Sequence, residues 1–209
     1  LIYSLSVIAI IYTSLVALMQ DDIKKLIAYS SVAHMGFVTL GIFSRNIEGL
    51  HGAMFQMISH GIISAALFFS VGALIERKNM KYINSYSGIW KKMPLFGSFF
   101  FIFVLGAIAL PGTTGFIGEF LILIGSFKIK FYLSFLAGIG IILSAAYFLW
   151  LYGRLFFGNI NSNVKSISNL NNYEIMIFSL LSFFVIFFGI YPDLLIKLYE
   201  LSINKLIVI

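Results

Sequence analysis

The stretch from Leu105 to Phe120 constrains the fold of this chain more than any other, because it combines a membrane-like composition with a break in the helix. Its sequence, LGAIALPGTTGFIGEF, lies inside an apolar run long enough to cross a bilayer, yet it contains Pro111, Gly112 and Gly115, followed by the carboxylate of Glu119. Every backbone group freed at such a depth needs a partner, so non-helical backbone in a membrane normally lines a cavity or packs against protein. A broken membrane helix that carries a buried acid is typical of transport proteins.

The composition indicates that most of the chain is surrounded by lipid. Of the 209 residues, 60% are hydrophobic, 17% are aromatic and only 11% are charged. The mean hydropathy is +1.01, and several runs approach the ~20 apolar residues that span a bilayer. These values predict an all-α, polytopic membrane protein. The chain has no Cys, so we expect no disulfide, no thiolate metal site and no cysteine nucleophile.

The apolar runs predict about six transmembrane helices, one of them broken. Asp22 is expected to cap the second helix, and Pro94 is expected to open the fourth. A short polar turn is expected at 44–51, and a surface loop at 158–172 because this segment is rich in Asn. The predicted helices are 1–19, 23–43, 52–75, 94–127 with its break at 111–115, 131–157 and 173–190, followed by an interfacial or terminal helix at 194–209.

The distribution of charge predicts an orientation rather than a nucleic-acid partner. The net charge of +6 comes from basic residues in short connections between apolar runs, as in cytoplasmic or matrix loops, so we expect no binding of nucleic acid. If the spans alternate, one side holds nine of the fourteen Lys and Arg residues, and both chain ends lie on the opposite side. The nine are Lys24, Lys25, Arg77, Lys78, Lys81, Lys91, Lys92, Arg154 and Lys165.

Polar side chains near the middle of two predicted helices are the first candidates for function. His34 lies about a dozen residues into its helix, and Ser30 and Ser31 one turn before it are its expected hydrogen-bond partners. On the next helix Gln56, His60 and Ser64 follow one another at intervals of four, so they share one face. Such a stripe is either an interhelical hydrogen-bond seam or part of a proton relay, and the residues alone leave both readings open.

Charged residues at two helix starts complete the candidate set. Lys24 and Lys25 lie in the first turn of their helix, where lysines often reach back to the interface. Glu119 is expected in the first turn of the second half-helix, where free amide groups favour a carboxylate while burial opposes its ionisation. A balance between these effects suits a group that takes up and releases protons. Thr113 and Thr114 are possible polar support in the break.

Three motifs resemble those of the antiporter-like membrane subunits of respiratory complex I. They are DIKKLIAYSSVAHMG at 22–36, MISHG at 57–61 and LPGTTGFIGEF at 110–120. Their order and spacing match that family over essentially the whole chain, which makes the set highly specific. Within the family the resemblance is to the chain 4 branch, because Glu119 stands where chains 2 and 5 and the cation/proton antiporter subunits typically carry Lys.

This resemblance implies about fourteen helices built from two inverted five-helix repeats. Residues 1–157 look like the second repeat, with its broken helix at 111–115, and residues 158–209 look like a polar loop, a final transmembrane helix and a tail. The first repeat, with its buried Glu and two Lys, has no counterpart here. We therefore expect a separate chain carrying that first half, although a shortened sequence of an ordinary member would look the same.

The resemblance also implies a function and its residues. The chain would be a proton-translocating, non-redox subunit of NADH:ubiquinone oxidoreductase, in the mitochondrial inner membrane or a bacterial plasma membrane. Lys24, His34, His60 and Glu119 would form the proton pathway. We expect no cofactor or metal in this chain, with NADH, FMN, iron–sulfur clusters and ubiquinone in other subunits, and with chain 2-like and chain 5-like subunits and lipids as partners. The alternatives are a subunit of a cation/proton antiporter without redox activity, and a structural remnant that only fills the membrane arm.

Overall fold

The computed structural model describes residues 1–208, with side chains through Leu206, and this part of the chain is all-helical apart from loops and one isolated β-bridge. The expected all-α class is therefore confirmed. The helices are α1 (Ile2–Leu18), α2 (Ile23–Ile42), α3 (Ile47–Lys78), α4 (Pro94–Ala107), α5 (Thr114–Phe127), α6 (Phe131–Phe156), α7 (Asn172–Ile190) and α8 (Asp193–Val208), with short 3-10 turns η1 (Ile83–Ser85) and η2 (Ile89–Lys91) after α3. Residue 209, the last of the expected terminal helix, lies outside the described residues.

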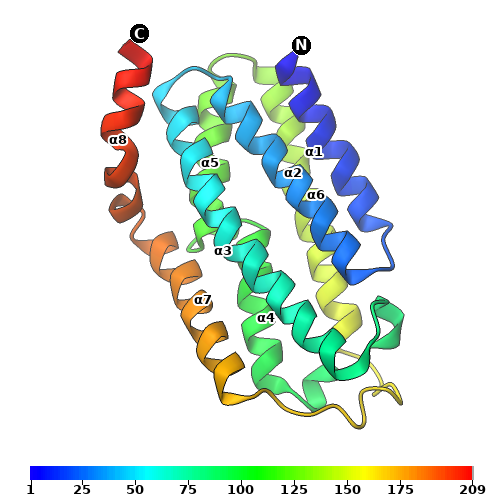
Figure 1. Cartoon of the computed structure of the whole chain (residues 1–209). Coiled ribbons are helices and arrows are strands. Elements are labelled where there is room, and N and C mark those ends of the chain that lie inside the picture. Colours follow the sequence, from blue (N-terminus) through cyan, green and yellow to red (C-terminus); the bar gives the residue numbers. More distant parts are fainter. Residues whose placement is uncertain (209) are drawn as a thin grey trace.

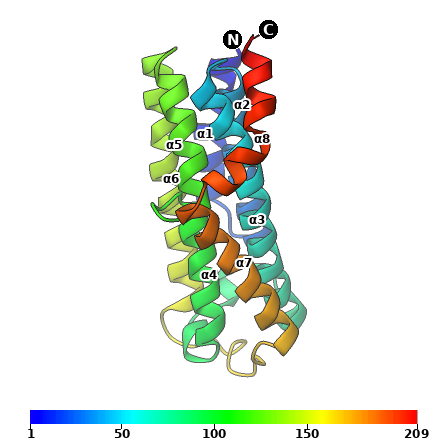
Figure 2. The same cartoon turned by 90° about the vertical axis from the view of Figure 1, so that its left-hand side faces the viewer.

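The helices run roughly parallel and antiparallel in one elongated bundle (Figure 1). α4 and α5 follow each other end to end, as do α7 and α8, so each pair covers the height that α3 covers alone (Figures 1 and 2). Both termini lie at the end of the bundle that also carries the α2–α3 and α5–α6 connections. This arrangement matches the orientation expected from the alternating spans.

Some helices are long enough to cross a bilayer alone, whereas the two half-helices α4 and α5 do so only together. α2, α3, α6 and α7 are long and apolar enough to cross a bilayer, whereas α1, α4 and α5 are apolar but shorter. α4 and α5 have 14 residues each, about 21 Å apiece at 1.5 Å per residue. Together they exceed the ~30 Å of hydrocarbon in a bilayer, so the broken pair spans the membrane as one unit.

Polar side chains cap the starts of α2 and α3. The carboxylate of Asp22 accepts hydrogen bonds from the amides of Lys24 and Lys25, as expected for the cap of α2. The expected turn at 44–51 is wrong, because α3 starts five residues earlier than predicted. Asn46 caps it by accepting from the Gly49 amide at 2.9 Å, and its side-chain NH₂ donates to the Gly125 carbonyl on α5. The polar side chain thus starts one helix and fixes another.

The break between α4 and α5 covers 108–113 rather than 111–115. Two residues there have positive φ, Ala109 at 55° and Gly112 at 93°, and the chain can turn at Gly112 without the strain that a Cβ would add. Gly115 is instead part of α5, and a Cβ at this position would lie 2.1 Å from the Gly106 carbonyl oxygen of α4. On α7, Gly189 lies so close to the break that a Cβ there would be 2.5 Å from the Gly112 oxygen. The break is therefore covered by another helix.

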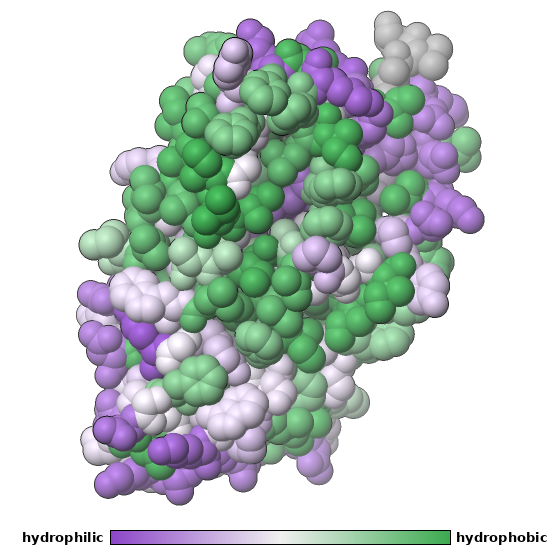
Figure 3. Space-filling model, turned by 180° about the vertical axis from the view of Figure 1, so that it is seen from behind, coloured by the Kyte–Doolittle hydropathy of each residue, from purple (hydrophilic) through white to green (hydrophobic). Residues whose placement is uncertain are grey.

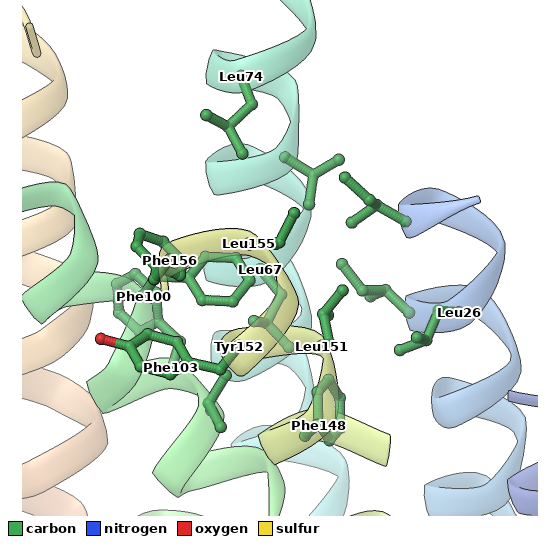
Figure 4. Close-up of a cluster of buried hydrophobic side chains, with 14 of the residues drawn as sticks. Leu26, Leu67, Leu74, Phe100, Phe103, Phe148, Leu151, Tyr152, Leu155 and Phe156 are labelled. Atoms are coloured by element: carbon green, nitrogen blue, oxygen red, sulfur yellow. The ribbon is translucent and has the colours of Figure 1, made fainter. Parts of the chain in front are cut away.

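Aromatic and aliphatic side chains from α2, α3, α4, α6 and α7 fill the half of the bundle that holds α4. Figure 4 shows side chains of α2, α3, α4 and α6 from this cluster. Phe100, Phe103 and Phe156 are fully buried there, and the Tyr152 hydroxyl donates to the Gly97 carbonyl. The outer surface seen from behind is apolar over a broad central and upper area, with hydrophilic groups gathered toward the two ends (Figure 3). This distribution is the one expected for a protein surrounded by lipid.

The C-terminal helix is a packed element of the bundle. α8 runs along the upper part of α3 (Figure 1), and Leu195, Tyr199 and Ile203 form an apolar cluster with Phe55 of α3. Pro192, just before α8, separates it from α7. The expectation of a terminal helix in this region is thereby confirmed.

The loop after α3 is fixed by buried polar contacts. The Tyr86 hydroxyl donates to the carbonyls of Leu74 and Met80, and burial raises the pKa of this phenol to about 12. The backbone of the same loop pairs with the α1–α2 connection, because the Ile23 amide donates to the Lys81 carbonyl and the Ile83 amide donates to the Asp21 carbonyl. The most basic loop of the protein is thus ordered against the start of α2.

Arg77 joins the end of α3 to the start of α7. Its guanidinium donates to both carboxylate oxygens of Glu174, at 2.7 and 2.6 Å, and to the carbonyls of Ala73, Ser168 and Asn169. The two side chains are only 10% and 13% exposed. Paired, charge-assisted hydrogen bonds of this kind are stronger than neutral ones and define the geometry as well.

We predict that Arg77→Gln lowers the free energy of unfolding by roughly 2 kcal/mol, because Glu174 and two loop carbonyls lose their charged donor. Thermal unfolding of the detergent-solubilised protein measures this loss. Lys78→Gln is the matched control, since within the described residues Lys78 makes a single exposed hydrogen bond, to Ser166, and its loss is expected to be nearly neutral. Equal melting temperatures for Arg77→Gln and Lys78→Gln would contradict the anchoring role.

Candidate proton-transfer site

Glu119 lies at the centre of the bundle and is only 1% exposed. The expectation that it belongs to the first turn of the second half-helix is wrong: α5 begins at Thr114, so Glu119 is its sixth residue and lies in the second turn. The favourable effect of a helix start falls off within the first turn. The carboxylate is therefore stabilised mainly by side chains of neighbouring helices.

Two side chains bind the same oxygen of this carboxylate. Nδ1 of His34, on α2, lies 2.8 Å from Oε1 of Glu119, and Nε2 of Gln56, on α3, donates to that oxygen at 3.2 Å. An ionised carboxylate can only accept, so His34 then donates through Nδ1–H. All three residues are buried. The other oxygen, Oε2 of Glu119, has no partner among the described residues.

His60 extends this cluster along α3. Its ring centroid lies 5.5 Å from that of His34, with the ring planes inclined at 43°. The interval of four residues predicted that Gln56 and His60 share a face, and the structure places Gln56 against Glu119 of α5 and His60 against His34 of α2. Two imidazoles, one amide and one carboxylate from three helices thus meet at the level of the break.

Close contact between α3 and α5 holds Gln56 in place. A Cβ at Gly118 would lie 2.4 Å from Oε1 of Gln56 and 2.8 Å from its Cα, so only glycine fits at this position. A Cβ at Gly52 would similarly lie 2.6 Å from the Ile122 amide nitrogen. Small residues let membrane helices approach closely in this way. Gly52 and Gly118 therefore let α3 and α5 approach closely enough for the Gln56 side chain to reach Glu119.

A small cavity lies beside the two histidines. Its volume is about 10 Å³, which is near the minimum that accommodates one water molecule. Polar residues make up half of its lining, together with apolar residues of α2, α3, α4 and α6. The lining residues are Ile27, Ser30, Ser31, His34, His60, Ile63, Ser64, Leu67, Ala107 and Phe148.

The expected hydrogen bonds from Ser30 and Ser31 to His34 are absent among the described residues. Ser30 and Ser31 donate to the Ile27 carbonyl, so they are not hydrogen-bonded to His34 but line the cavity beside it. Thr113 donates to the Leu110 carbonyl within the break, and the buried Thr114 hydroxyl lacks a partner within residues 1–208. Ser64, the last member of the α3 stripe, donates to the carbonyl of Gly61, also on α3. All of these hydroxyls except that of Thr114 donate hydrogen bonds to backbone carbonyls.

Lys24 is not part of the buried cluster. It lies ten residues before His34 on α2, about 15 Å along the helix axis, and is exposed. There it lines a groove of about 620 Å³ together with Glu76, Asn79 and Glu174. The apolar side chains of Ile27 and Leu67 line the cavity that lies toward the histidines. Lys24 therefore stands at the aqueous end of α2, separated from Glu119.

Two buried polar groups near the site were not identified from the sequence. Tyr147 of α6 is fully buried, and its hydroxyl has no hydrogen-bond partner in the described part of the chain. His51 is 9% exposed and its ring lies 5.7 Å from that of Tyr199. Tyr147 could have been identified from the sequence, because it lies in the middle of a predicted helix, where its hydroxyl needs a hydrogen-bond partner.

This arrangement can exchange protons over short distances. A carboxylate and an imidazole 2.8 Å apart can share or transfer a proton, and a second imidazole within ring contact provides the next acceptor. Burial makes an unpaired charge costly here, so the cluster favours states in which its charges compensate each other. The chemistry that the geometry supports is proton transfer within the membrane.

The family of the chain can now be stated. The family model described as "NADH:quinone oxidoreductase/Mrp antiporter, TM" matches residues 1–144, so the chain belongs to this family of transmembrane proteins. That match includes all four residues expected in the proton pathway.

Individual relatives show which branch of the family the chain resembles. The chain is similar to NADH-ubiquinone oxidoreductase chain 4 of Marchantia polymorpha, with 49% identity over 99% of this chain and 42% of that protein. Among solved structures it resembles a chain of respiratory complex I from Thermus thermophilus, with a TM-score of 0.87 and 32% identity over 99% of this chain and 44% of that one. The expected resemblance to the chain 4 branch is confirmed.

A chain of the Mrp complex from Dietzia sp. DQ12-45-1b shares the fold, with a TM-score of 0.88, but only 18% identity, over 99% of this chain and 47% of that one. The chain thus spans less than half the length of the relatives that it matches. Together with its apolar helices, the family match identifies it as an integral membrane protein.

We predict that Gly118→Ala disturbs the site, because its methyl group would displace Gln56 from Glu119. The expected cost of this overpacking is about 1–3 kcal/mol of stability, measured by thermal unfolding in detergent. Gly72→Ala is the matched control, since no atom of the described part of the chain lies within 4 Å of a Cβ built there. The packing argument would fail if both variants melted at the wild-type temperature.

Proposed function

We propose that this chain is a non-redox, proton-translocating part of the membrane arm of NADH:quinone oxidoreductase. The observation that carries the proposal is the buried hydrogen bond between His34 and Glu119, with Gln56 and His60 beside it. Buried ionisable groups in a membrane are costly and are usually functional. The similarity to chain 4 of Marchantia polymorpha supports the choice of complex.

The central step of the proposed proton transfer takes place between His34 and Glu119. When His34 is doubly protonated, Nδ1–H can pass its proton to Oε1 of Glu119, which leaves a neutral imidazole and a neutral acid. His60, 5.5 Å away between ring centroids, can then reprotonate His34 through the small cavity that both line. Gln56 holds the carboxylate in place during these steps. Each step moves one proton. The second step needs a doubly protonated His60 and follows release of the proton from Glu119, so that the positive charge returned to His34 again faces a carboxylate.

Lys24 and the free oxygen of Glu119 define the two ends of the proposed path. Lys24 lies in an open, polar groove, so it is the group that exchanges with water. The hydroxyls of Ser30 and Ser31, which face the small cavity, are supporting groups between this end and the histidines. At the other end Oε2 of Glu119 is the position from which a proton leaves toward a neighbouring subunit or the outer side.

Electron transfer belongs to other subunits in this proposal. We propose that NADH, FMN, iron–sulfur clusters and ubiquinone are bound elsewhere in the complex. The partners in the membrane are then other membrane-arm subunits, among them chain 2-like and chain 5-like ones, in an inner mitochondrial or a bacterial plasma membrane.

We expect Glu119→Gln to abolish most proton pumping while leaving NADH oxidation measurable in uncoupled membranes, because the variant keeps the shape and the hydrogen bonds of the side chain but cannot take up a proton. Pumping is measured with a pH-sensitive dye in vesicles that contain the assembled complex. Glu200→Gln, an exposed residue of α8, is the matched control. Full pumping by an assembled Glu119→Gln complex would show that the chain only fills the arm.

His60→Gln separates a proton relay from a structural hydrogen-bond seam. Gln keeps a polar side chain at this position but carries no titratable group, so we expect assembly to be normal and pumping to fall. Native gel electrophoresis measures assembly and the same vesicle assay measures pumping. If both stay normal, the α3 stripe is packing alone.

The alternative function, a cation/proton antiporter without redox activity, shares the same fold. Purification distinguishes the two, because membership of the oxidoreductase requires NADH-oxidising subunits in the same particle. A particle that contains this chain, lacks those subunits and exchanges cations for protons would favour the antiporter.

A further inference from the structure

A long apolar groove follows the outer side of α5 and α6, away from the proton-transfer site. Its volume is about 610 Å³, and nearly all of its wall is apolar. Phe120 and Phe127 of α5 form one side, and Phe135, Ile139 and Ile142 of α6 form the other. These five side chains are between 36% and 70% exposed, so the groove is open to the surroundings.

The length of the groove fits one leaflet of a bilayer. Its lining residues run from Phe120 on α5 to Lys128 just after that helix, and from Ser134 to Ile142 on α6, which is about 12 Å along each segment at 1.5 Å per residue. Half of a typical hydrocarbon core is about 15 Å. The groove begins at Phe120, about 9 Å along the axis from the start of α5 at 1.5 Å per residue, and ends beside the α5–α6 connection. That connection lies at one end of the bundle (Figure 1).

Positive charge lies at the outer end of this groove. Lys128 lines it and forms an ion pair with Glu48, whereas Lys130, two residues later, is exposed and forms no ion pair with any described residue. The local balance of these three groups is one positive charge. Tyr132 is 80% exposed at the same level, as is typical of aromatic residues at a membrane interface.

Gly138 leaves the middle of the groove open. It belongs to the lining, and no atom lies within 4 Å of a Cβ built on it. The close helix contact expected of a membrane glycine is therefore absent at this position within the described chain. A side chain here would occupy the groove without disturbing the contacts of α6.

We propose that this groove binds an acyl chain of an anionic phospholipid, whose headgroup phosphate lies against Lys130 and Lys128. The apolar walls, the length of one leaflet and the positive charge at one end together match this ligand. The site lies on the outer face of α5, the helix that carries Glu119, and it does not depend on the proton-transfer function proposed above. Bound lipid shields the second half-helix from other contacts on this face.

The test uses the whole particle that contains the chain, reconstituted in nanodiscs of phosphatidylcholine with phosphatidylglycerol. A photoactivatable phosphatidylglycerol is the probe, and mass spectrometry locates its adducts. We expect adducts on α5 and α6 within 120–142. Gly138→Leu should abolish them because it fills the groove, and Lys130→Gln should reduce them about fivefold, the effect of one lysine near an anionic surface.

Gly61→Leu is the control, since it also adds a side chain where no atom lies within 4 Å, and it should leave the adducts unchanged. Lys130→Gln concerns an exposed loop residue, so it keeps the test valid if Gly138→Leu does not assemble. Adducts that persist in Gly138→Leu, or an equal yield with a phosphatidylcholine probe, would overturn the proposal. A photo-crosslinker at Ile139 that captures another protein chain instead of lipid would overturn it as well.

Discussion

A carboxylate buried in a membrane needs hydrogen-bond donors supplied by the protein, and the arrangement of this bundle follows from that need. Glu119 receives its donors from two other helices, His34 on α2 and Gln56 on α3. Gln56 reaches it only because α3 and α5 touch at glycines such as Gly118. The break frees α5 from the axis of α4 and lets it take this position. The close helix contact, the break and the polar cluster therefore depend on one another.

The sequence predicted what depends on periodicity and depth, because these follow from residue spacing along one helix. It located the spans, the cap at Asp22 and the shared face of Gln56 and His60, and the structure agrees. It failed where the outcome depends on contacts between helices. Ser30 was expected to bind His34, but a carboxylate on another helix provides a stronger acceptor. Spacing along one helix carries no information about that partner.

Boundaries were also missed for physical reasons. The expected turn before α3 counted Glu48 and His51 as loop because they are polar, but Asn46 caps the helix earlier and these residues are helical. The break was assigned from Pro111 and the glycines, yet Ala109 adopts a positive φ, which its residue type disfavours. Gly115 serves contact with α4 rather than a turn. The division of the chain at residue 157 and the roles of the individual site residues stay predictions.

The cover that α7 gives to the break has a consequence for how the protein responds to its surroundings. Gly189 places the backbone of α7 directly against Gly112 and Thr113, so the carbonyl group there meets another peptide and not acyl chains. Non-helical backbone at this depth is tolerated only under such protein cover. The polarity around the break is consequently determined by the chain itself. A change in the thickness or the lipid composition of the bilayer alters the outer faces of the helices and leaves the dielectric environment at the centre of the bundle unchanged.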